Sequence, residues 1–125
     1  MSTYYGTIAL PQLACLEEQH QLQKMFPTQP WTLAQQQQYR QLLQLPLPLF
    51  PLLWKQNQDH NYNIIDGQQR ISLMGNLYHY GCQLQLLPPS ERQRLSQRQV
   101  PVLILPPHTS LAIQQLYHRR YNYGH

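Results

Sequence analysis

One stretch of the sequence predicts a strand, a tight turn and a helix in direct succession. Residues 62–65 are β-prone, and the dipeptide Asp66-Gly67 that follows them is typical of turns. Beyond this turn, apolar residues recur three and four positions apart, which indicates a helix, and Gly81 is placed to end it. A second apolar segment follows at 100–105. The chain is therefore predicted to contain a β-α-β unit and to belong to the mixed α/β (α+β) class.

Two helices are predicted before that strand. A proline can open the first, over residues 11–25. Thr32 and Gln35 have the spacing of a capping box, which would begin a second helix over residues 32–45. The residues between these helices, 26–31, contain prolines and are predicted to form a loop, because a proline disfavours the helical conformation of the residue before it.

Prolines also decide where the remaining elements are expected. The apolar segment 47–54 carries prolines, so it suits an edge strand better than a central one. Pro101 likewise indicates an edge position or a strand start for the segment that contains it. A short helix is expected around residues 90–95, and Thr109 or Ser110 can cap a last helix.

The composition limits the class of protein. Its 125 residues suit one domain, and only 11% of them are charged against about 25% in an average soluble domain, with glutamine in their place. Nine Lys and Arg against five Asp and Glu give a net charge of +4, which favours a polyanionic partner. The most apolar stretch, residues 45–54, is too short and too rich in proline to cross a bilayer, and the first residues do not resemble a secretory signal, so a cytoplasmic location is expected. The two cysteines and six histidines lack metal-ligand spacing.

The predicted turn is a candidate anion site. The first N–H groups of a helix have no acceptor within it and point toward the preceding turn, where Gly67 would let a phosphate approach the backbone of Gln68 and Gln69. Arg70, one turn into the helix, could reach the same oxygens. Asp66 could hold a divalent metal, bind a ribose hydroxyl or orient water. The structural alternative is an ordinary Asp-Gly turn beside a helix start.

The string Asp-Gly-Gln-Gln-Arg at residues 66–70 resembles the DGQQR signature of a domain family found in the GmrS and GmrD restriction proteins. It is similar, more distantly, to the G-x-x-R turn of ParB-like nucleases and sulfiredoxin. Gln-Pro-Trp at 29–31 resembles the family's Gln-Arg-Pro segment and the tryptophan after it, without the arginine, and residues 120–124 resemble its Arg-Leu-Asn-x-Gly stretch. The resemblance thus extends over residues 26–124. Sulfiredoxin has its cysteine inside the turn, where this chain has glutamine, so peroxiredoxin repair is disfavoured.

This resemblance implies a compact ParB/sulfiredoxin-like domain, with a small mixed sheet, a strand-DGQQR turn-helix-strand unit and flanking helices. A single domain is expected over residues 1–125, with a helical segment over 1–25. The resemblance further implies nucleotide binding or hydrolysis at the turn, with ATP or GTP and Mg²⁺, and a role on DNA in defence against phage or plasmids. Asp66 and Arg70 would then be catalytic, and Asp66 the metal ligand, of an NTPase or a DNA-nicking nuclease.

Two further hypotheses concern partners. Five arginines could form a strip that binds nucleic acid, or an ordinary solvated basic face: Arg92, Arg94, Arg98, Arg119 and Arg120. The alternative function is non-enzymatic. A protein-interaction or regulatory module would bind a protein partner or a second copy through its glutamine-rich helices and its proline-rich edge strand.

Overall fold

The computed structural model describes residues 4–57 and 60–123, with the backbone alone for 121–123. Its strands are β1 (Tyr4–Ala9), β2 (Leu22–Lys24), β3 (Leu52–Gln56), β4 (Tyr62–Asp66) and β5 (Gln99–Leu105). All of them pair in one sheet in the order β1-β5-β3-β4-β2. The pairs β1/β5 and β3/β4 are antiparallel, whereas β5/β3 and β4/β2 are parallel. The mixed α/β class predicted from the sequence is confirmed.

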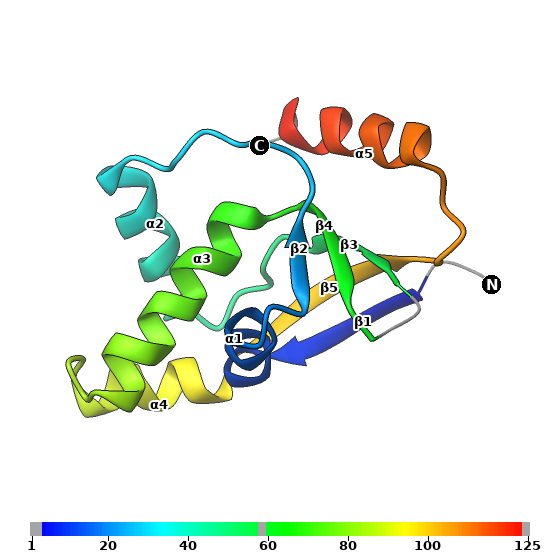
Figure 1. Ribbon diagram of the computed structural model, residues 1–125. Helices are drawn as coiled ribbons and strands as arrows, with labels where there is room; N and C mark the ends of the chain where they lie inside the picture. Colours follow the sequence, from blue (N-terminus) through cyan, green and yellow to red (C-terminus); the bar gives the residue numbers. More distant parts are fainter. Residues whose placement is uncertain (1–3, 58–59, 124–125) are drawn as a thin grey trace.

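Helices cover both faces of this sheet (Figure 1). They are α1 (Leu10–Glu18), α2 (Leu33–Leu43), α3 (Gln68–Asn76), the π-helical η1 (Leu77–Gln83), α4 (Pro89–Gln97) and α5 (Leu111–Tyr123). The first four α-helices contribute to the main core on one face, and α5 packs on the smaller core of the other. In the described part of the chain, no helix is both long and apolar enough to span a membrane.

Side chains that point alternately to the two faces of the central strands build these two cores. Leu52 and Trp54 of β3 point into the main core, whereas Leu53 between them belongs to the smaller one. On β4, Ile64 and Ile65 divide in the same way. Successive side chains of a strand point to opposite faces, so both faces of β3 and β4 are buried.

The segment predicted to be helical over residues 1–25 differs most from the prediction. Residues 4–9 form β1, and the helix that follows them ends at Glu18. His20 then adopts a positive φ of 58°, and the chain continues as β2 beside β4. The helical spacing of the leucines was misleading, because Leu22 belongs to a strand and packs into the core from there, rather than from a helix.

The expected edge position of the proline-rich segment is wrong. Its prolines precede β3, which begins at Leu52 and lies in the middle of the sheet. The segment 100–105 is not an edge strand either, since β5 lies between β1 and β3. Pro101 lies opposite Thr7 of β1, and the pairing of β5 with β3 begins one residue later, at Val102, so the proline comes just before β5 has a neighbour on both sides. The sheet edges are β1 and β2.

The helix after the turn also runs further than predicted. Gly81 does not end it, because α3 continues through η1 to Gln83. A side chain at Gly81 would collide with Leu87, so a close approach explains this glycine better than a helix end. The β-α-β unit is present in sequence order, but β4 and β5 are antiparallel with β3 between them. The second helix is confirmed, including the capping box of Thr32 and Gln35 at its start.

Candidate functional site

The predicted strand, turn and helix occur where the sequence indicates. β4 ends at Asp66, Gly67 adopts a φ of 106°, and α3 begins at Gln68. Ile71 N–H donates to Gly67 O over 2.9 Å as the first turn of α3 closes. A side chain at Gly67 would be strained by this φ and would collide with Leu52, so glycine is required here on two grounds.

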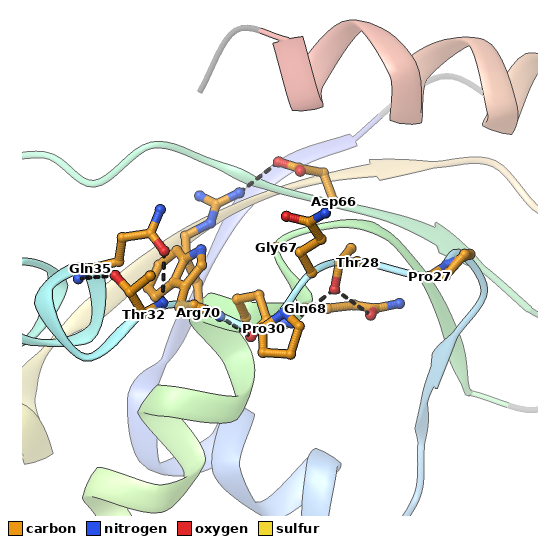
Figure 2. Close-up of a pocket in the computed structure, with 12 residues that line it drawn as sticks. Pro27, Thr28, Pro30, Thr32, Gln35, Asp66, Gly67, Gln68 and Arg70 are labelled. Atoms are coloured by element: carbon orange, nitrogen blue, oxygen red, sulfur yellow. Dashed lines mark hydrogen bonds and ion pairs between the residues drawn. The ribbon is translucent and has the colours of Figure 1, made fainter.

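A cavity of about 620 Å³ lies beside this turn. Its walls come from the turn, from the loop after β2 and from the start of α2, and Figure 2 shows these side chains around it. The lining residues are Pro27, Thr28, Gln29, Pro30, Trp31, Thr32, Gln35, Asp66, Gly67, Gln68, Gln69 and Arg70. The turn predicted to bind an anion is therefore open on one side rather than packed under other residues.

The side chains of Gln68 and Gln69 hold the loop in place. Gln68 Nε2 donates to Phe26 O over 2.9 Å, and its Oε1 accepts a bond from Thr28 Oγ1. Gln69 Nε2 donates to Thr28 Oγ1 over 2.9 Å, while its Oε1 accepts from Trp31 N–H. Both amides thus make internal bonds with both of their polar atoms. The phosphate-binding role predicted for these residues rests on their backbone N–H groups.

Arg70 and Asp66 form an ion pair with each other. Arg70 Nη2 lies 2.7 Å from Asp66 Oδ2, and Nη1 donates to Phe50 O over 2.8 Å. The two residues are only 7% and 6% exposed. The guanidinium predicted to neutralise a phosphate is therefore engaged with an internal carboxylate, and the pair contributes no net charge to the cavity.

The donor set does not fit a metal held by the protein. Among the described residues that line the cavity, Asp66 is the single carboxylate, and it is already paired with Arg70. No three His, Cys, Asp or Glu residues come together in a way that could hold a metal ion anywhere in residues 4–57 and 60–123. Mg²⁺ prefers carboxylate and phosphate oxygens in octahedral geometry, which one paired carboxylate does not supply.

Trp31 forms part of the wall of the cavity. Its indole meets the ring of Tyr39 edge to face, with 5.4 Å between the ring centroids, and its carbonyl accepts a bond from Gln36 Nε2. Burial raises the pKa of Tyr39, and the charges of Arg70 and Arg98 oppose that rise. Tyr39 is therefore a neutral phenol beside the ion pair. Trp31, in contact with Tyr39 and Gln36, presents an aromatic surface to the cavity.

The predicted five-arginine strip does not exist as one surface. Arg92 and Arg94 lie on α4, which packs on the main core, whereas Arg119 and Arg120 lie on α5, on the opposite face of the sheet. Arg98 Nη2 donates to Leu47 O over 2.5 Å. The resemblance noted at 120–124 extends to residues whose side chains lie outside the described part of the chain.

The sequence did not identify three contributors to this site. Thr28 joins the two glutamines, the carbonyl of Phe50 accepts from Arg70, and His118 of α5 contacts both the loop and the strand. His118 stacks on Phe26 with 4.5 Å between the ring centroids, and its Nδ1 lies 2.8 Å from Ile65 O. These contacts join residues that are at least 20 positions apart, whereas a sequence pattern reports only near neighbours.

Comparisons with protein-family models, curated proteins and solved structures found no match to this chain. The resemblance of residues 66–70 to the DGQQR signature therefore stays a prediction.

Proposed function

We propose that the cavity beside the DGQQR turn binds the phosphate of a nucleotide. The observation that carries the proposal is the start of α3 on the cavity wall, directly after Gly67. The N–H groups of Gln68 and Gln69 precede the first intrahelical bond, and such groups favour an anion through both hydrogen bonding and the helix dipole.

The charge of the cavity limits what it would hold. Its two charged lining residues, Asp66 and Arg70, neutralise each other, which leaves the roughly +0.5 charge of the helix N-terminus as the main attraction. This favours a single phosphate group over a triphosphate. Trp31 would offer a face on which a base can stack. The exposed Gln29 would offer an amide that can form hydrogen bonds with the edge of that base.

Hydrolysis is not part of this proposal. Activity as an NTPase or a nuclease, the use of ATP, GTP and Mg²⁺, and a role in defence are predictions of the family resemblance alone. Asp66 would have to leave Arg70 to act on a metal or a water molecule.

Calorimetric titration with adenosine monophosphate tests the proposal. Gln29→Glu places a negative charge on the cavity wall and is expected to weaken binding about tenfold, because two negative charges would then lie close together. Gln29→Arg is expected to strengthen binding by a similar factor. Gln115→Glu, an equal charge change on the exposed face of α5, is the matched control. The proposal fails if the wild type does not bind, or if the substitutions at Gln29 and Gln115 have equal effects.

A second candidate function is protein binding at a sheet edge. This function would use β1 rather than the proline-rich segment, because among the described strands β1 pairs on one side only, with β5. Its sequence, Tyr-Tyr-Gly-Thr-Ile-Ala, contains neither charge nor proline, the features that normally protect an edge from pairing. Light scattering after size exclusion tests it: a monomer that binds adenosine monophosphate contradicts self-association as the function.

A further inference from the structure

A second cavity, the sheet cavity, opens on the face of the sheet that carries the main core. Its volume is about 350 Å³, and among the described residues it shares no lining residue with the cavity beside the turn. Its walls come from β1, β3, β4, β5 and α1. Figure 1 shows α1 at the end of β1, whereas the start of that strand lies away from this helix. Some of the apolar wall residues pack against the main core but are only partly buried, namely Ile8, Leu16, Tyr62 and Ile104. The main core therefore meets the surface in this cavity.

Three residues lie side by side across the floor of the sheet cavity. Ile104 of β5 pairs with Tyr4 of β1 on one side and with Trp54 of β3 on the other. Paired residues of neighbouring strands share a face of the sheet, so two aromatic side chains flank the isoleucine. The ring of Tyr4 also extends over Gly6, where a Cβ would lie 2.7 Å from it. Tyr62 adds a third ring, whose centroid lies 5.1 Å from that of Trp54. The floor is therefore an apolar surface bordered by aromatic rings.

The lining of the sheet cavity favours a neutral ligand. Among the described residues that line it, none is Asp, Glu, Lys or Arg. A charged ligand would lose water on entry without gaining a contact with an opposite charge, which is unfavourable. The sheet cavity differs in this respect from the cavity beside the turn, where the start of α3 favours an anion.

Trp54 brings a hydrogen-bond donor to the sheet cavity. The residue is 2% exposed, and its Nε1 is buried without a partner among the residues that the structure describes. A buried indole N–H normally has an acceptor, because an unpaired one loses the hydrogen bond that it would make with water. The indole can only donate, so it needs an atom with a lone pair. A ligand in the sheet cavity that carries a carbonyl oxygen would supply this acceptor.

We propose that the sheet cavity binds a neutral aromatic molecule of about two rings, whose carbonyl oxygen accepts a hydrogen bond from Trp54 Nε1. The size follows from the volume, since an apolar cavity of about 150 Å³ holds benzene and this one is roughly twice as large. Tyr4 and Tyr62 would pack against the rings of the ligand, because aromatic rings favour offset or edge-to-face contacts. This site does not depend on phosphate binding beside the turn, so either proposal can fail alone.

Heteronuclear NMR of the two indole N–H groups tests the proposal. The chain has two tryptophans, so each titration reports on Trp54 and on Trp31 of the other cavity, and the variant Trp31→Phe assigns the signals. The probes are methyl naphthyl ketone, ethylnaphthalene, which lacks the oxygen, and naphthoate, which is charged. We expect the ketone to move the signal of Trp54 and to leave that of Trp31 unchanged. The ketone should bind about fivefold more tightly than ethylnaphthalene, the effect of one hydrogen bond, and at least about tenfold more tightly than naphthoate.

Two adjacent tyrosines of β1 provide a matched pair of variants. Tyr4 is 62% exposed and lines the sheet cavity, whereas Tyr5 is 61% exposed and points to the opposite face of the sheet. Both side chains are exposed, so both alanine variants should fold. Tyr4→Ala is expected to weaken ketone binding about tenfold, because one aromatic contact and its buried area are lost. Tyr5→Ala is expected to leave this binding unchanged.

Four outcomes would overturn the proposal. If the ketone leaves the signal of Trp54 in place, or moves that of Trp31 instead, the sheet cavity does not bind it. Equal affinities for the ketone and ethylnaphthalene would mean that Trp54 Nε1 gains no acceptor from the ligand. Equal losses from Tyr4→Ala and Tyr5→Ala would reduce the binding to general contact with exposed aromatic rings. A tetraproline peptide that moves the signal of Trp54 when the ketone does not would assign the surface to proline-rich peptides, which also bind grooves lined by aromatic residues.

Discussion

Replacing Arg70 by glutamine should destabilise the protein far more than the same change at Arg40, although both arginines make ion pairs of nearly equal length. Arg70 Nη2 lies 2.7 Å from Asp66 Oδ2, and Arg40 Nε lies 2.8 Å from Glu91 Oε1. The two pairs differ in burial. The Arg70 side chain is 9% exposed and the Arg40 side chain 42%.

The expected magnitudes follow from this difference. Loss of Arg70 leaves the carboxylate of Asp66 in a buried position without its cation, a change that costs about 3–5 kcal/mol of the free energy of unfolding. Loss of a largely exposed partner such as Arg40 costs about 0–1 kcal/mol. For 125 residues the entropy of unfolding is about 0.26 kcal/mol/K, so each kcal/mol lowers Tm by about 4 °C. We expect Tm to fall by about 11–19 °C for Arg70→Gln and by less than about 4 °C for Arg40→Gln.

Thermal and urea unfolding followed by circular dichroism would measure both losses. The double variant Asp66→Asn with Arg70→Gln removes both charges together, and it should lose about 1–3 kcal/mol less than the sum of the single variants. A loss below about 1 kcal/mol for Arg70→Gln, or equal losses at Arg70 and Arg40, would refute the reasoning, because burial would then not decide the strength of the pair. A low stability of Arg70→Gln would also mean that weak ligand binding by this variant is no evidence for a phosphate contact.

Three other predictions can be measured by the same unfolding experiments. Thr32→Ala removes the hydroxyl that caps α2 and should cost about 1 kcal/mol, whereas Thr32→Ser should retain most of the stability. Gly67→Ala should cost about 2 kcal/mol or more, because alanine is strained at a φ of 106° and its Cβ would collide with Leu52; an unchanged Tm would contradict the positive φ. Burial raises the pKa of Glu17, so its charged form is disfavoured in the folded state and stability is lost as the pH rises through that pKa. Glu17→Gln should therefore raise Tm at pH 7, with a gain that shrinks as the pH falls through the raised pKa and is absent below the usual value of 4.5; Glu18→Gln, its exposed neighbour, serves as the control.

Sequence patterns predicted the parts of the fold that depend on near neighbours. The capping box of Thr32 and Gln35 spans three residues, and it begins a helix where predicted. The β-prone segment before Asp66 and the glycine after it gave the strand, the turn and the helix start that form one wall of the cavity. Each of these features depends on backbone conformations and hydrogen bonds within about one helical turn.

The same patterns failed where a distant partner decided the outcome. Residues 4–9 are a strand because β5 lies beside them, and nothing in those six residues indicates that partner. The prolines near residue 50 suggested a sheet edge, but they end before β3 begins. Pro101 suggested an edge as well, but it lies in an inner strand, one residue before that strand begins to pair with β3.

The candidate site shows the same difference between features set by near neighbours and features set by distant partners. The sequence by itself determined that a glycine with a positive φ precedes the start of the helix, because this local geometry depends on residues 66–70 alone. Only the tertiary structure decided that Arg70 binds Asp66 and Phe50 O, that the two glutamines hold the loop near Thr28, and that a cavity remains between them. The physical reason is that a polar side chain takes whichever partner the folded chain brings within about 3 Å, and that partner comes from segments whose approach depends on the packing of the whole sheet and its helices.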